Sequence, residues 1–179
     1  MGTGAIDPYY SHIYVVVYRE DSGVFTEVLA PVYPQAAFAF IAATDGPLLL
    51  ADGGGVLVSN GTPAWTNIGV PSASGITLRA AACTTSTDLR LVGSAGGSFG
   101  APVLPYAWHW DGSAWSTEPL PLPAGYTDGS ATQILTTPAG TFWAIGSGSY
   151  TLSGGYYPTV ALVWRLVAGV WTVAGILTP

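Results

Sequence analysis

The side chains able to carry out chemistry are few in this 179-residue chain, and they are poorly spaced for it. Residues 96–100 read Gly-Gly-Ser-Phe-Gly, which matches the G-x-S-x-G motif with Ser98 as nucleophile. That motif works at a sharp strand-to-helix turn, whereas Pro102 follows here and no helix is predicted. No histidine follows Asp111 or Asp128 to complete a triad. We therefore predict a loop at this position and no catalytic residue.

Metal-binding side chains of the nitrogen and sulfur type are equally scarce. A structural zinc site needs four Cys or His ligands, and the chain offers only Cys83, His12 and His109. Cys83 lies in an apolar run, which predicts a small buried side chain. His109 alternates with Trp108 and Trp110, so it is expected on the opposite face of a strand. The sequence therefore predicts no zinc site.

Carboxylates could bind calcium or, in pairs, hydrolyse glycosides. Asp45, Asp111 and Asp128 could hold calcium together with carbonyl groups, but each precedes a glycine, where aspartate commonly forms a turn. A glycosidase needs two convergent carboxylates, and the chain has only three glutamates and no arginine cluster for an anionic substrate. We predict that the chain is not an enzyme and has no metal and no cofactor.

The composition bounds the class of protein. Only 8% of residues are charged, against roughly 25% in ordinary globular domains, and the net charge is −6. The four arginines are scattered, so nucleic-acid binding is disfavoured. No apolar stretch reaches the roughly 20 residues of a membrane-spanning helix, and the N-terminus does not resemble a signal peptide. A surface so poor in charge is expected to be partly covered by neighbours, as in a homo-oligomer or a larger assembly.

Aromatic residues are the best candidates for binding. Four tyrosines in predicted loops could contact sugars or peptides: Tyr126, Tyr150, Tyr156 and Tyr157. Trp108, which shares a strand face with Tyr106, is a further candidate. Five tryptophans recur at equivalent places of a repeat and are expected to fill the core between its units: Trp110, Trp115, Trp143, Trp164 and Trp171.

One hairpin unit recurs four times along the chain. It joins an apolar strand, a short turn, and a second strand that begins with an aromatic residue followed by Thr or Ser. These aromatic pairs are Phe25-Thr26, Trp65-Thr66, Trp115-Ser116 and Trp171-Thr172. Two of the turns contain Asn60-Gly61 and Asp111-Gly112, and such dipeptides are strong hairpin signals because both residues tolerate positive φ.

A second hairpin unit alternates with the first, which gives four strands per repeat, the content of a propeller blade of roughly 40–50 residues. The sequence therefore predicts one all-β domain over 1–179, a β-propeller or propeller-like array of four-stranded antiparallel blades. The predicted parts are an N-terminal hairpin, 12–31, and three blades, about 36–71, 75–123 and 130–179. Such a set closes only if the hairpin acts as a thin fourth blade or another chain completes it. Otherwise it remains an open arc covered by a partner.

The repeat resembles a known kind of protein. Residues 109–116 read His-Trp-Asp-Gly-Ser-Ala-Trp-Ser, and residues 142–146 read Phe-Trp-Ala-Ile-Gly. This pattern resembles the repeats of actinobacterial and actinophage β-propeller proteins of the kelch-like or sialidase-like Asp-box type. The resemblance implies a propeller fold and is silent on activity, because propellers host many functions.

Our leading functional hypothesis is a non-enzymatic structural or interaction protein that acts through self-association or docking. A phage virion component, such as a tail, fibre or capsid-surface protein, fits the low charge, the lack of a signal peptide and the unclosed set of blades. The expected location is then the virion, and otherwise the cytoplasm. The alternative is a lectin-like, carbohydrate-binding propeller that uses its loop tyrosines.

Overall fold

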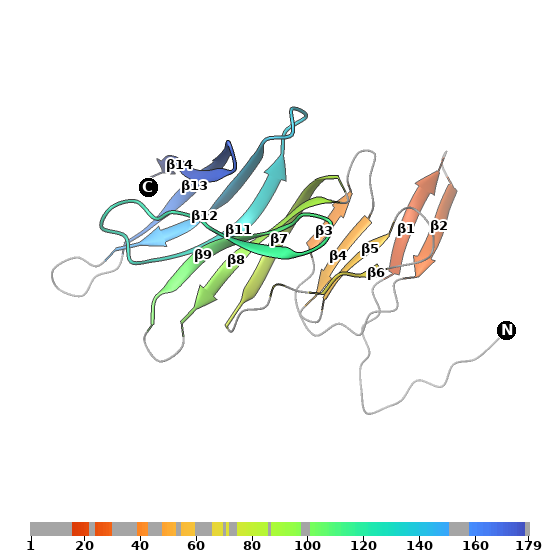
Figure 1. Cartoon of the computed structure of the whole chain (residues 1–179), viewed down its shortest axis with the longest axis horizontal. Coiled ribbons are helices and arrows are strands. Elements are labelled where there is room, and N and C mark those ends of the chain that lie inside the picture. Colours follow the sequence, from red (N-terminus) through yellow and green to blue (C-terminus); the bar gives the residue numbers. More distant parts are fainter. Residues whose placement is uncertain are drawn as a thin grey trace, which may run out of the picture.

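The computed structural model describes residues 16–21, 24–29, 39–42, 48–52, 55–59, 66–69, 71, 75–85, 87–97, 101–150 and 158–177. Every regular element among them is a β-strand (Figure 1). Accordingly, this part of the chain contains no helix of the length and apolarity needed to cross a membrane.

The strands form one hairpin and three four-stranded sheets. The hairpin pairs β1 (Val16–Asp21) with β2 (Val24–Leu29). Sheet I consists of β3 (Ala39–Ala42), β4 (Leu48–Asp52), β5 (Gly55–Ser59) and β6 (Thr66–Asn67). Sheet II consists of β7 (Thr77–Thr85), β8 (Asp88–Gly96), β9 (Val103–Trp110) and β10 (Trp115–Pro119). Sheet III consists of β11 (Asp128–Thr136), β12 (Phe142–Ser149), β13 (Thr159–Val167) and β14 (Val170–Leu177).

Each sheet is an antiparallel meander, in which strands that follow one another in sequence lie side by side. The predicted all-β class and four-stranded antiparallel sheets are thereby confirmed. The three sheets span 39–67, 77–119 and 128–177, against predicted ranges of 36–71, 75–123 and 130–179. Figure 1 shows an open stack, with the hairpin beyond sheet I at one end and sheet III at the other. The described strands do not form a closed ring.

Sheet II is buried on both faces because a sheet packs on each side of it. Its side chains toward sheet III join one core cluster with that sheet: Ala82, Val92, Ala107 and Leu120 with Phe142, Leu162 and Trp164. Those toward sheet I form a second cluster with Val56: Ala81, Cys83, Leu89, Leu91 and Trp108. Successive sheets meet at their first strands, since β3 contacts β7 and β7 contacts β11.

Tryptophan N–H groups tie neighbouring sheets together. The three donor–acceptor pairs are Trp115 Nε1 to the Ile68 carbonyl at 3.1 Å, Trp164 Nε1 to the Pro121 carbonyl at 2.7 Å, and Trp171 Nε1 to Glu118 Oε2 at 2.7 Å. In each bond the donor belongs to one sheet. The acceptor belongs to the preceding sheet or to the segment that follows the last strand of that preceding sheet. As predicted, these indoles fill the space between repeat units, and Trp110 packs on Trp115. Trp143 differs, because it is only partly buried and lies on the face of sheet III that none of the described sheets covers.

A glycine of the second strand faces a bulge of the first strand in both sheet II and sheet III. The pairing register of β7 with β8 and of β11 with β12 shifts at this place. A Cβ atom on Gly93 would lie 1.9 Å from the carbonyl oxygen of Thr77, and one on Gly146 would lie 2.0 Å from that of Ser130. Only glycine leaves room for this close backbone approach. The repeated glycine of the sequence is therefore a requirement of the bulge.

Gly146→Ala is expected to lower the free energy of unfolding by about 1–3 kcal/mol or more, because the added methyl group overlaps the Ser130 carbonyl. Chemical denaturation measures this change. Gly175→Ala in β14 is the matched control, since its Cβ would meet nothing closer than Val163 Cβ at 3.9 Å. Equal stability of the two variants would contradict the proposed role of the bulge.

Candidate functional site

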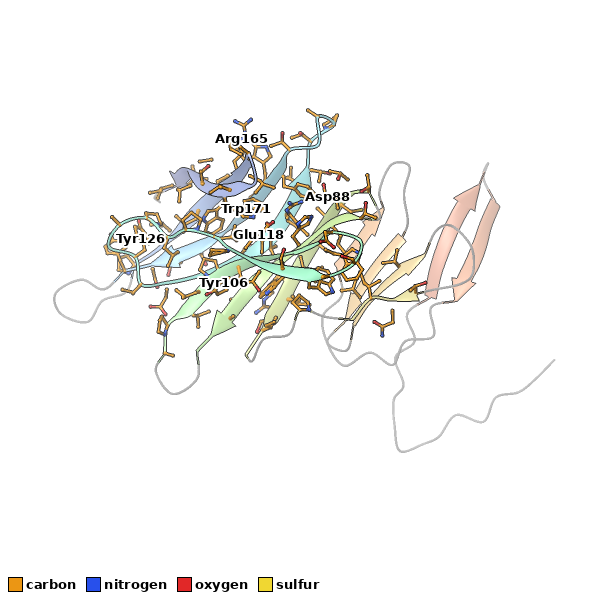
Figure 2. The ribbon with its side chains drawn as sticks, viewed as in Figure 1. Asp88, Tyr106, Glu118, Tyr126, Arg165 and Trp171 are labelled. Carbon is orange, nitrogen blue, oxygen red and sulfur yellow. The ribbon has the colours of Figure 1, made fainter. Side chains whose placement is uncertain are left out.

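Two of the predicted loop tyrosines meet at one end of sheet III. The ring centroids of Tyr126 and Tyr150 are 5.0 Å apart, with their planes inclined at 60°. Tyr126 precedes β11 and Tyr150 directly follows β12, so neighbouring strands bring the two rings together. The Thr127 N–H donates a hydrogen bond to the Ser149 carbonyl at 3.0 Å, which fixes the two segments side by side. Figure 2 shows Tyr126 at this end of the molecule.

A shallow groove of about 200 Å³ lies across the ends of β11, β12 and β13; it includes Ser149, the sequence neighbour of Tyr150, but neither tyrosine ring lines it. Its polar side chains are small: Asp128, Ser130, Ser147, Ser149 and Thr159. The Asp128 carboxylate accepts hydrogen bonds from the Val103 N–H at 3.1 Å and from the Thr127 hydroxyl at 3.0 Å. No basic residue lines the groove among the residues that the structure describes. The groove therefore presents hydroxyl groups and one carboxylate, and it suits a neutral, hydroxyl-rich ligand.

The other predicted binding residues have different positions. Tyr156 and Tyr157 lie outside the described residues, in the segment that connects Tyr150 with Pro158. Trp108 is only 1% exposed and packs between sheets I and II, where it is a core residue and no ligand contact is open to it. Sequence reasoning named both tyrosines but predicted neither their contact nor the groove, because the groove's serines and threonine carry no distinctive spacing.

A cluster of charged residues, here called the Arg90 cluster, lies on the face of sheet II toward sheet III. It comprises Arg90, Asp88, His109 and Glu118. Arg90 is 7% exposed, bonds Asp88 through Nη1, and donates to both oxygens of Glu118 at 3.2 and 3.3 Å. His109 lies between the two acids, with Nε2 3.0 Å from Asp88 and Nδ1 3.6 Å from Glu118.

Sheet III covers the Arg90 cluster. The Phe142 ring lies under the Arg90 guanidinium, whose Cζ is 4.4 Å from the ring centroid. Trp171 donates its N–H to Glu118, and Figure 2 shows these two side chains close together with Asp88 nearby. Removal of one partner from a buried ion pair typically costs about 3–5 kcal/mol, so the ion pairs stabilise sheet II, and Trp171 and Phe142 link them to sheet III.

The environment of Asp88 favours its charged form. Burial by itself opposes the charge, but the hydrogen bond from Thr84 and the positive charge of Arg90 outweigh it, so the pKa of Asp88 lies below its ordinary value of 3.8. The sequence carried a signal for this cluster that our reading missed. Asp88 and Arg90 are two residues apart on a strand and so share a face, and Arg90 pairs with His109 in the neighbouring strand.

Of four further candidates from the sequence, two have structural roles and two lie outside the described residues. Asp111 accepts hydrogen bonds from the backbone N–H groups of Ala114 and Ser113 and from the Ser113 hydroxyl, and these lower its pKa to about 2. It therefore shapes the β9–β10 turn, as Asp-Gly predicts. Cys83 is buried, which raises the pKa of its thiol. Ser98 and Asp45 lie outside the described residues.

The face of sheet III that points away from sheet II carries exposed apolar side chains; we call it the outer face. Its exposed large residues include Leu135, Ile145, Val167 and Val170, with 47%, 37%, 47% and 62% of their surface accessible. Arg165 lies over the ring of Trp143 on the same face, with its Cζ 5.3 Å from the ring centroid. An apolar sheet face of this kind is suited to contact another sheet.

Within the described part of the chain, no three His, Cys, Asp or Glu side chains are placed to hold a metal ion. No family model, curated protein or solved structure matches this chain. Its function must accordingly be argued from the groove, the Arg90 cluster and the outer face themselves.

Asp88→Asn is expected to change how the free energy of unfolding depends on pH in the acid range. A carboxylate whose pKa is lower in the folded state contributes stability above its unfolded pKa, near 3.8, and loses it as the pH falls through the folded value. The difference in unfolding free energy between wild type and Asp88→Asn should therefore be constant near neutral pH and shrink below about pH 4. Denaturation series between pH 7 and pH 2 measure it. A difference that stays constant to the lowest pH would remove the assigned role of Asp88.

Proposed function

We propose that this chain is a non-enzymatic structural protein that acts by docking its sheets onto neighbouring molecules, as a component of a larger particle such as a phage virion. The observation that carries the proposal is the outer face of sheet III, where Leu135, Ile145 and Val170 remain exposed. Contiguous apolar patches on soluble proteins commonly mark interaction sites. The low charge of the chain, with 8% charged residues, agrees with a surface that is partly covered in the assembly.

The arrangement of the sheets supports a propeller-type architecture for the assembled protein. Four-stranded meanders stack face to face and meet at their first strands, β3, β7 and β11. In a ring of such blades, every sheet is covered on both faces. Here sheet II is covered on both faces, whereas sheet III is covered on one. A further sheet is needed to complete the stack.

The polar groups support binding and assembly rather than catalysis. Arg90, Asp88 and Glu118 bond one another between two sheets, and Asp111 is engaged by its own turn. The groove supplies hydroxyl groups and a single carboxylate, Asp128, which itself accepts two hydrogen bonds. A pair of titratable groups with opposed roles, as acid–base catalysis needs, is not found among the described residues that line it.

A second function, carbohydrate binding, is favoured by the groove and by Tyr126 and Tyr150 at the same end of sheet III. Sugar rings present hydroxyl groups to polar side chains and C–H faces to aromatic rings. The groove provides the first contact through Ser149, Thr159 and Asp128, and the tyrosine pair, which lies outside the groove lining at the same end of sheet III, offers aromatic rings for the second. Its volume of about 200 Å³ is below the roughly 300–1,000 Å³ of drug-sized pockets, which suits one sugar residue. The absence of a basic residue among its described lining favours a neutral saccharide over an anionic one.

The structural role predicts that the full-length protein forms a defined oligomer. Burial of the outer face against another molecule removes apolar surface from water, which favours association at roughly 25 cal/mol per Å² before the cost of ordering is counted. Size-exclusion chromatography with light scattering, run over a concentration series into the millimolar range, measures the mass. A monomer at every concentration would count decisively against self-association.

The carbohydrate role predicts that a neutral saccharide binds and that Tyr150→Ala weakens binding about tenfold, because a ring contact is lost. Tyr150→Phe keeps the ring and should retain most of the affinity. Saturation-transfer NMR with a panel of neutral methyl glycosides, and with sialyllactose as an anionic comparison, measures binding. Thr117→Ala, an exposed change on β10, is the control. Lack of signal from every neutral glycoside, or full binding by Tyr150→Ala, would rule this role out.

A further inference from the structure

We propose that the outer face of sheet III docks onto the N-terminal hairpin end of a second copy of this chain, in a head-to-tail contact. This inference rests on the proposed structural function and names the occupant of the exposed face. Three observations carry it: the repeat-equivalent face of sheet II is buried, the charges of the two ends are complementary, and the hairpin of the same copy lies elsewhere.

The outer face of sheet III is built like a face that this protein buries. Ile145 precedes the bulge-facing glycine of sheet III, and Val92 holds the same place in sheet II. Val92 is 0% exposed because sheet III covers it, whereas Ile145 is 37% exposed. Leu135 corresponds to Ala82 by the same register, and the two are 47% and 4% exposed. Since the equivalent positions of sheet II are covered by a sheet of this chain, the natural cover for sheet III is a further sheet of the same kind.

Charge distinguishes which end of a second copy fits. Arg165 is the only charged residue in β12, β13 and β14. The hairpin strands carry three acids and one arginine, which gives β1 and β2 a net charge of −2. Asp128 at the start of β11 is the one acid in the strands of sheet III, and the opposite charges of Arg165 and the acidic hairpin favour a contact between them.

The occupant comes from another molecule. In Figure 1 the hairpin stands beyond sheet I, at the end opposite to sheet III, so the hairpin of the same copy does not cover the outer face. A head-to-tail contact joins different surfaces of the two copies, and it produces either a closed ring or a filament. Ring closure by two or more copies would leave each sheet covered on both sides.

Disulfide trapping tests the orientation directly. Thr172→Cys places a thiol on the exposed outer face, and Thr26→Cys places one on β2 of the hairpin; the native Cys83 is buried. Under mild oxidation, a mixture of the two variants should form cross-linked dimers, and neither variant alone should. Cross-linking by Thr172→Cys alone would show two outer faces in contact and would overturn the head-to-tail arrangement.

Charge insertion tests the surface. Ile145→Asp should raise the dissociation constant of the oligomer more than about tenfold, because a carboxylate would be buried in the contact. Ala139→Asp adds the same charge at an exposed turn of sheet III and should leave association unchanged. Val170→Asp, at a position that is 62% exposed, serves as a second variant if Ile145→Asp unfolds.

The outcomes separate this inference from the proposed function. If the wild type forms an oligomer that Ile145→Asp and Val170→Asp leave intact, the outer face is not the interface and only the inference fails. If the wild type is a monomer at all concentrations, both fail. Loss of the oligomer in these variants alone, with cross-links only in the cysteine mixture, is the expected result.

Discussion

In sheet II an apolar face is turned to each side, and a neighbouring sheet covers each of them. Val92 and Ala107 are fully buried against sheet III, while Leu89 and Trp108 are buried against sheet I. A four-stranded meander of this composition cannot leave either face in water without losing most of the burial that stabilises it. The stacking of the sheets, the position of the tryptophans and the exposed outer face of sheet III all follow from this one requirement.

Hydrogen bonds from tryptophan side chains fix how neighbouring sheets stack. The indole N–H groups of Trp115, Trp164 and Trp171 reach across to the preceding repeat unit, which sets the spacing of neighbouring sheets. The Arg90 cluster, whose charged residues all belong to sheet II, contacts sheet III through the Trp171 N–H on Glu118 and the Phe142 ring under Arg90. Such clusters demand complete pairing, because a buried charge without a partner is costly.

Binding is expected at two surfaces of sheet III: the groove at one end of its strands and the outer face. Strand ends and loops gather at the end of sheet III, where the tyrosine pair and the serine-lined groove lie at the surface. The outer face of sheet III carries apolar side chains, which suits it to the proposed association. Ser147 of the groove and Ile145 of the outer face are two residues apart in β12 and share a face, so a partner docked on this face would lie next to the groove.

The sequence by itself determined the class and the repeat, because turn dipeptides, strand alternation and recurring aromatic pairs are local properties. It also predicted that Asp111 forms a turn, that Cys83 is buried, and that His109 and Trp108 lie on opposite faces of one strand. It did not identify Trp108 as a core residue closed to ligands. The alternation of a strand shows which residues share a face, but it does not show which of the two faces another sheet will cover. The Arg90 cluster, the meeting of Tyr126 with Tyr150, and the exposure of Trp143 arise from contacts between strands and sheets far apart in sequence. Only the tertiary structure decides these, because burial depends on which face finds a neighbour.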